Sequence, residues 1–121
     1  MALDKERTEV AYRLGRLLAT LDILQGDALG QVNASIVDRF YGSASSTPAA
    51  VFPTLIRRGR NHLNKLARDK PGLAVTRERL IQEIISTIKG FPKTLGLEDQ
   101  GLFSIGFYHQ RQDFFTKKGE N

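Results

Sequence analysis

The stretch LEDQGLFSIGFYHQRQDFFTKK, residues 97–118, decides the fold. It holds four of the seven Phe residues, and Tyr108 brings its aromatic residues to five. At about 100° per residue, a helix here has two apolar sides. One side carries Gly101, Leu102, Ile105, Gly106 and His109, and the other carries Phe103, Phe107 and Phe114. Since a helix with two apolar sides is typical of a buried position, we predict that this segment is the central helix.

Charges at the two ends of this segment agree with a helix. Glu98 and Asp99 suit the first turn, where exposed N–H groups favour negative charge, and Lys117 and Lys118 suit the last turn. Each interior glycine costs about 1 kcal/mol relative to Ala in a helix. We therefore expect both glycines to let another backbone pack closely.

Length and composition limit the class of protein. The 121 residues suit a single domain over residues 1–121 with one core. With no Cys and two His, disulfides and a zinc site are not expected. No apolar run suits a membrane span or a signal peptide, so we expect a soluble, cytoplasmic chain with no membrane partner. The net charge of +5 favours a polyanionic partner, with nucleic acid ahead of an acidic membrane surface or an acidic protein.

Helical periodicity dominates the first half of the chain. Apolar residues recur at spacings of three and four across residues 4–25, with Glu9, Arg13 and Arg16 off that stripe. A turn bracketed by Gly26 and Gly30 precedes a short helix from about residue 33. Residues 41–47, YGSASST, are small and polar and predict a loop.

Two further helices are expected between that loop and residue 90. Thr47 and Pro48 predict a capped start, and Pro71 with the following glycine predicts the end. Thr76 is the predicted N-cap of the next helix, with Val75 and Leu80 as a hydrophobic staple, and Gly90 and Pro92 close it. No strand pair or repeat is evident, so the predicted fold is an all-α, single-domain bundle of about five helices.

The largest charge imbalance lies between residues 39 and 68, which include no Asp or Glu. The polar residues there lie opposite the apolar face of the third helix, or just before that helix in the chain. They are the candidate nucleic-acid-binding residues: Arg39, Arg57, Arg58, Arg60, Asn61, Asn64, Lys65 and Arg68. Arg side chains suit phosphate oxygens, and Asn adds neutral donors. The alternative is an ordinary solvated helix face, which the charge pattern alone favours.

Catalytic residues are not evident in the sequence. His109 and Asp113 stand at i and i+4, as an acid–base pair would, but a core histidine satisfied by a hydrogen bond is favoured. His62 borders an apolar face, and the same interpretation is favoured for it. The chain has no phosphate-binding loop, no nucleophile elbow and no acidic metal cluster. We expect no enzyme activity, no catalytic residue, no cofactor and no metal. Tyr41 can stack on a base, but packing is favoured.

Two strings carry a family resemblance: DRFYGSASSTPAAVFPTLIR, residues 38–57, and QGLFSIGFYHQRQDFF, residues 100–115. They resemble the C-terminal region of the large subunit of the type I-C CRISPR Cascade, and the resemblance extends across most of the chain. In that family an internal start in the same reading frame also yields a separate helical small subunit. Met1 at a predicted helix start is similar to that product.

The resemblance implies a non-catalytic subunit of a crRNA-guided surveillance complex. Its partners would be the backbone and large subunits, the crRNA-containing complex and target DNA, whose displaced non-target strand it would stabilise in the R-loop. Cutting would belong to a separately recruited helicase-nuclease, and the parts that read the PAM lie outside this chain. With this resemblance, phosphate binding by Arg57, Arg58, Lys65 and Arg68 is favoured over a solvated face.

Two alternatives remain open at this point. A purely structural adaptor would dock the basic arc on acidic protein surfaces without touching DNA. An independent DNA-binding regulator is less favoured, because no helix-turn-helix with a compact turn is evident.

Overall fold

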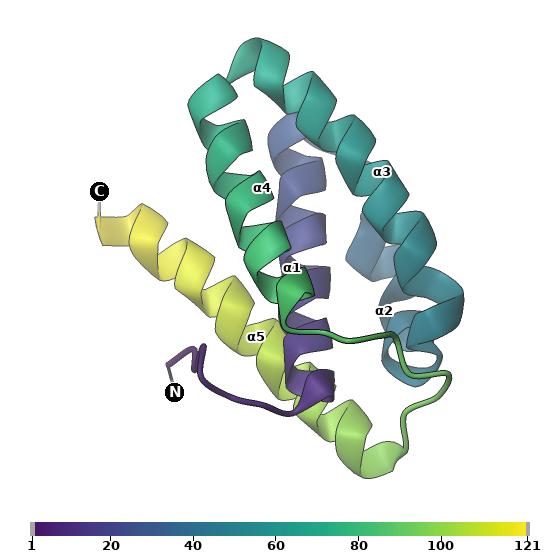
Figure 1. Ribbon diagram of the computed structural model, residues 1–121. Helices are drawn as coiled ribbons and strands as arrows, with labels where there is room; N and C mark the ends of the chain where they lie inside the picture. Colours follow the sequence, from purple (N-terminus) through teal and green to yellow (C-terminus); the bar gives the residue numbers. More distant parts are fainter. Residues whose placement is uncertain (1, 121) are drawn as a thin grey trace.

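The computed structural model consists of consecutive helices joined by connecting segments (Figure 1). It describes the backbone of residues 2–120 and the side chains of residues 2–116. The helices are α1 (Val10–Leu29), α2 (Ile36–Ser46), α3 (Pro48–Asp69), α4 (Pro71–Ser86) and α5 (Leu97–Glu120). No strand occurs among the described residues. The predicted all-α bundle is therefore confirmed.

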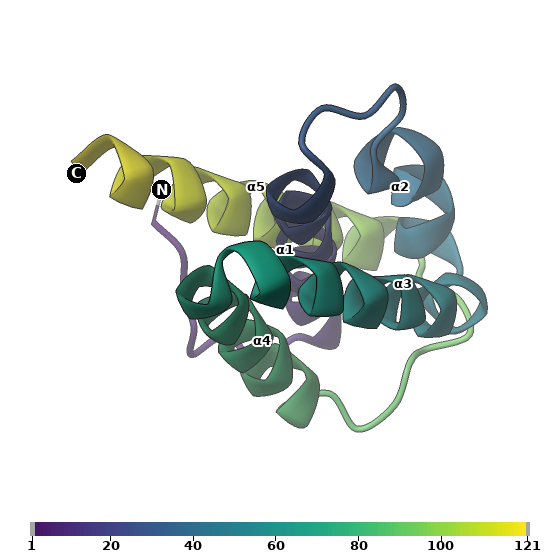
Figure 2. The same ribbon diagram turned by 90° about the horizontal axis from the view of Figure 1, so that it is seen from above.

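Helix α1, and not α5, is the central helix of the bundle. Figures 1 and 2 show α1 between α5 on one side and α3 and α4 on the other. Residues of α1 are buried on every side of the helix, from Ala11 to Ala28. By contrast, α5 keeps one side exposed, and Leu97 at its start is 87% exposed. The prediction that residues 97–118 form the central helix is wrong, because only the side of α5 that faces α1 is covered.

Glycine sets the contact between α1 and α5. A Cβ on Gly106 would overlap the backbone carbonyl of Tyr12, and a Cβ on Gly15 would overlap the carbonyl oxygen of Phe103. The close-packing prediction is therefore confirmed for Gly106. It is wrong for Gly101, where an added Cβ would meet nothing within 4 Å.

The first helix begins and ends later than predicted. Residues 2–9 are not helical, so no helix starts at the beginning of the described chain. Glu9 has extended backbone geometry and stands at the N-cap position of α1. The helix passes through Gly26 and ends at Leu29, and its C-cap is Gly30, whose φ of 73° is accessible to Gly and costly for other residues. Arg16, predicted off the apolar stripe, is only 4% exposed, because α5 covers that side of α1.

Helix α2 includes most of the segment predicted as a loop. Its start is a capping box, in which the Ser35 hydroxyl accepts from the Asp38 N–H and the Asp38 carboxylate accepts from the Ser35 N–H. In the last turn, the hydroxyls of Ser45 and Ser46 both donate to the Gly42 carbonyl. Small polar residues are therefore compatible with a helix here, since their hydroxyls find acceptors in its own preceding turn.

The starts of α3 and α4 depend on proline rather than on Thr caps. Thr47 precedes α3, but its hydroxyl donates to Ser43 O instead of capping the helix. Pro48 occupies the first turn as predicted. Helix α4 begins at Pro71, not near Thr76, whose hydroxyl donates to Gly72 O inside the helix. The predicted staple is also wrong, since Val75 is 53% exposed.

The ends of α5 bear on two further predictions. Glu98 and Asp99 lie in its first turn, as predicted. Lys117 and Lys118 lie outside the residues whose side chains are described. Across residues 2–120, no helix has the length and apolar character needed to cross a membrane.

Candidate nucleic-acid interface

The α3 basic face is the set of exposed polar residues on the side of α3 that faces away from α1. All seven of its members are exposed to solvent: Arg57, Arg58, Arg60, Asn61, Asn64, Lys65 and Arg68. The opposite side of α3 is buried, with Gly59 against the Leu21 side chain of α1. The predicted orientation of these residues is therefore confirmed, while their binding role remains a prediction.

Four of these side chains form a row along α3. Arg57, Asn61, Asn64 and Arg68 stand at i, i+4, i+7 and i+11, so they share one side of the helix. Eleven residues at 1.5 Å rise give a row of roughly 16 Å. Its length lets a strand lie beside it with several phosphates in reach of a cation or an amide donor.

Arg60 is the member whose charge is most offset. Its Nη1 lies 3.1 Å from Glu78 Oε1 on α4, and both side chains are about half exposed. The sequence around Arg60 is free of acid, but the fold brings one from the next helix. Exposed pairs of this kind contribute about 1 kcal/mol or less, so Arg60 can exchange Glu78 for a phosphate.

The structure brings Arg39 of α2 close to only part of this face. Arg39 and Arg58 line one shallow depression of about 440 Å³ between the α1–α2 connection, α2 and α3. Arg58 also lines a second depression of about 480 Å³ with Thr54, Arg57, Arg60 and Asn61. Asn64, Lys65 and Arg68 line neither depression and lie farther along α3. The candidate residues therefore line two depressions that meet at Arg58. Beyond these depressions, the last three candidate residues of α3 lie on its open surface.

One contact at this junction was not anticipated from the sequence. The Arg58 guanidinium carbon lies 5.2 Å from the centre of the Phe40 ring, within the range of a cation–π interaction. Phe40 is half-buried against the core, while Arg58 is exposed. The sequence shows that an aromatic residue stands beside Arg39 and does not show its contact with Arg58.

The two histidines have structural surroundings. Burial, with a smaller contribution from the Arg58 charge, lowers the pKa of His62. His62 Nδ1 is buried and has no hydrogen-bond partner among the described residues. Both facts favour a neutral imidazole within the bundle.

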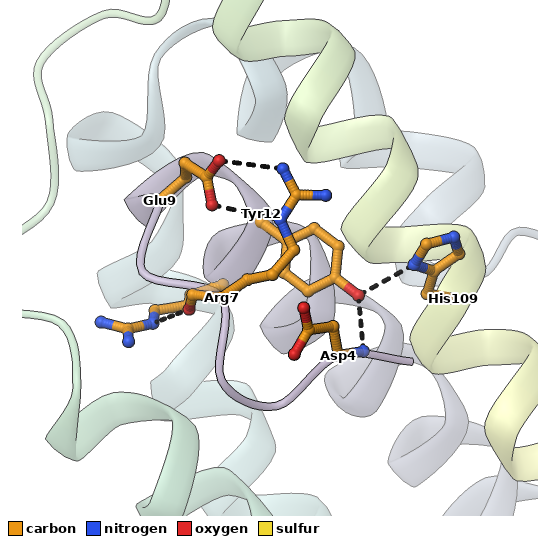
Figure 3. Close-up of polar contacts among 6 residues, drawn as sticks. Asp4, Arg7, Glu9, Tyr12 and His109 are labelled. Atoms are coloured by element: carbon orange, nitrogen blue, oxygen red, sulfur yellow. Dashed lines mark hydrogen bonds and ion pairs between the residues drawn. The ribbon is translucent and has the colours of Figure 1, made fainter. Parts of the chain in front are cut away.

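His109 belongs to a polar group at the base of α1, drawn in Figure 3. Its Nδ1 lies 2.8 Å from the Tyr12 hydroxyl, which also accepts a hydrogen bond from the Asp4 N–H at 3.0 Å. The Tyr12 hydrogen is then available for Nδ1, which favours neutral His109 with its proton on Nε2. Burial, followed by positive charges that include Arg7, lowers the pKa of His109.

The spacing of His109 and Asp113 in the sequence also allows an acid–base pair. The two residues do line one depression of about 310 Å³. The hydrogen bond of His109 Nδ1, however, goes to Tyr12 on α1. This geometry favours a structural role, in which His109 ties the segment before α1 to α5.

A comparison with models of protein families gives a match. The family model described as "CRISPR-associated protein (Cas_Csd1)" matches residues 1–115. That range includes α1 to α4 and most of α5, and so all eight candidate residues. A comparison with curated proteins gives no match.

Proposed function

The chain belongs to the CRISPR-associated protein family Cas_Csd1, and from this membership we propose that it stabilises the R-loop of a type I-C surveillance complex as a non-catalytic small subunit. The membership itself gives the chain a role in a CRISPR complex. Our proposal adds contact with the displaced non-target DNA strand, in a complex with the backbone and large subunits and crRNA. The proposal also includes a location in the cytoplasm, where the target DNA is found.

The observation that carries this proposal is the α3 basic face. It presents five cations and two amides, all exposed, on the side of α3 that faces away from the core. In RNA-guided recognition, guide pairing supplies sequence specificity. A protein that only holds the displaced strand therefore needs a positive track with stacking groups and no base-specific code. The α3 basic face has the charge, length and exposure of such a track.

A second candidate is the structural adaptor, which one observation favours. The side of α5 that faces away from α1 leaves four large apolar residues exposed: Leu97, Ile105, Tyr108 and Phe115. Apolar residues grouped on one helix side are typical of protein contacts. On this account α5 docks on a neighbouring subunit, the α3 basic face meets acidic protein, and DNA is not touched.

No catalytic step is part of the proposal. We expect the purified chain to show no nuclease or ATPase turnover, because its sequence has no phosphate-binding loop and His109 is bonded to Tyr12. Metal-dependent DNA cleavage that co-purifies with the chain and is lost in His109→Ala would contradict this. A contaminating nuclease would persist in that variant.

Salt dependence tests the phosphate contact directly. The chain is titrated onto a fluorescent single strand at several salt concentrations, and log Kobs is plotted against log[salt]. If about four cations each neutralise one phosphate, the slope is roughly −3, at about −0.7 per phosphate on a single strand. A slope near zero, or no binding at low salt, would contradict the contact.

A further inference from the structure

The depression between the α1–α2 connection, α2 and α3 differs from the rest of the α3 basic face. Figure 2 shows the α1–α2 connection arching beside the start of α2. The depression has a volume of about 440 Å³, which is within the size range of small-ligand sites. Its lining combines cations, amides and an aromatic ring: Gln25, Gln31, Val32, Asn33, Ala34, Ile36, Arg39, Phe40 and Arg58.

Arg58 lies over the ring of Phe40 at the wall of this depression. The guanidinium carbon is 5.2 Å from the ring centre, which is within the range of a cation–π interaction. Because Arg58 is exposed, its outer side is open to a second flat group. Unstacked nucleic-acid bases stack on guanidinium planes and on aromatic rings in this way.

The other polar groups suit a neutral base beside a phosphate. Gln31 and Asn33 are exposed, and side-chain amides both donate and accept hydrogen bonds, as base edges do. Arg39 adds a cation on the α2 side.

Among the residues that the structure describes, no carboxylate lines the depression. Three acids, Asp22, Asp27 and Asp38, lie nearby in the chain, and each has a partner elsewhere. Asp27 Oδ2 accepts from Arg77 Nε at 2.7 Å, and the other two bond to the start of α2. Asp38 Oδ2 accepts from the Ser35 N–H, and Asp22 Oδ1 accepts from the Val37 N–H, each at 3.0 Å. The local charge is therefore set by the two arginines.

We propose that this depression holds one unpaired base of the strand whose phosphates lie along the α3 basic face. The base stacks on the Arg58–Phe40 pair, and Arg39 contacts the adjoining phosphate. Arg58 also lines the second depression with Arg57 and Arg60, so the phosphate contacts continue from the base site without a gap. This site rests on the proposed function and adds a base contact to it. Stacking accepts any base, so sequence preference stays weak.

The test compares two strands with equal numbers of phosphates, an oligothymidylate and an abasic strand of the same length. We expect the wild-type chain to bind the oligothymidylate about tenfold more tightly at low salt, the effect of one stacked base. Arg58→Lys keeps the charge and removes the flat group. It should bring the ratio of the two affinities close to one.

Arg79→Lys is the matched control, since Arg79 is an exposed arginine of α4 that lies outside the α3 basic face and has no aromatic partner among the described rings. It should retain the preference for oligothymidylate. Thermal melts confirm that both variants are folded.

Each of the other outcomes would overturn a different part of the proposal. Equal binding of both strands by the wild type, with the salt slope intact, overturns the base site and leaves the phosphate contact standing. A preference that survives in Arg58→Lys overturns the assignment to this depression. No binding of either strand at low salt overturns the phosphate contact and the base site together.

Discussion

Gly106 of α5 lies against the backbone carbonyl of Tyr12 in α1, so closely that no Cβ fits between the two helices. Gly15 of α1 meets the Phe103 carbonyl in the same way, so each helix contributes one glycine to the crossing. This crossing lets α5 cover the side of α1 opposite α3. It thereby keeps the α3 basic face and the exposed side of α5 on different sides of the molecule.

Gly106→Ala should destabilise the fold by about 3 kcal/mol or more, because the new methyl group meets backbone atoms that cannot repack without separating the helices. Gly101→Ala is the control within the same helix. It has open space around it and should stabilise by up to about 1 kcal/mol through helix propensity. Urea unfolding followed by circular dichroism measures both. Equal effects of the two substitutions would show that the crossing does not depend on Gly106.

Phe107→Ala should cost roughly 3 to 5 kcal/mol, as expected when a large aromatic side chain is lost from a core. Phe107 is 2% exposed, and its ring lies 5.3 Å from that of Tyr41. Phe115 is 52% exposed, so Phe115→Ala should change the unfolding free energy by about 0.5 kcal/mol or less. If Phe107→Ala left the melting temperature unchanged, the packing of α5 described above would be wrong.

Stability should fall as the pH drops below about 6.5, the ordinary pKa of histidine. The pKa values of His62 and His109 are lowered in the folded chain, mainly by burial. The unfolded chain therefore binds more protons in this range, and stability rises with pH. Hydrogen bonds from Arg7 lower the pKa of Glu9 to about 2, so the stability that Glu9 contributes is lost mainly as the pH falls below its ordinary pKa of 4.5, outside the pH range of the melts.

Thermal melts near pH 7.5 and near pH 5 measure this dependence. The wild type should melt at a lower temperature near pH 5, and a His62→Gln, His109→Gln double variant should show a smaller difference. A double variant with the wild-type pH dependence would assign the effect to other groups.

Much of the fold follows from the sequence, since apolar spacing and proline placed α3 and gave the all-α class. The predicted helix boundaries were wrong where side chains form hydrogen bonds that the spacing of apolar residues does not reveal. Thr47 and Thr76 resemble N-caps, yet both hydroxyls donate to carbonyls of the preceding turn. The serines of α2 resemble a loop, yet they bond within the helix.

The sequence did not reveal which helix is central, because this depends on contacts between residues of different helices. Arg16 reads as a surface residue of α1, but its Nε donates to Gln110 Oε1 of α5 at 2.9 Å, in the interior. By contrast, the exposure of the α3 basic face was predictable from helical periodicity. The Arg60–Glu78 pair and the Arg58–Phe40 contact were not, because each joins α3 to another helix.

The central claim is that the α3 basic face holds the displaced strand. A variant with Arg57, Arg58, Lys65 and Arg68 changed to Glu should remain folded, because all four side chains are exposed. The matched control changes Lys5, Arg79, Lys89 and Lys93 to Glu, which alters the net charge equally at exposed positions outside α3. A variant that fails to co-purify with the other subunits, even without DNA, would support the adaptor account.

The most direct measurement is R-loop yield by the complex assembled with each variant, read by permanganate reactivity of the displaced strand's thymines. Our account predicts normal assembly with both variants, and reduced R-loop yield only when the α3 basic face is reversed. Normal assembly and a normal R-loop yield with that variant would contradict a role for the α3 basic face in holding the strand.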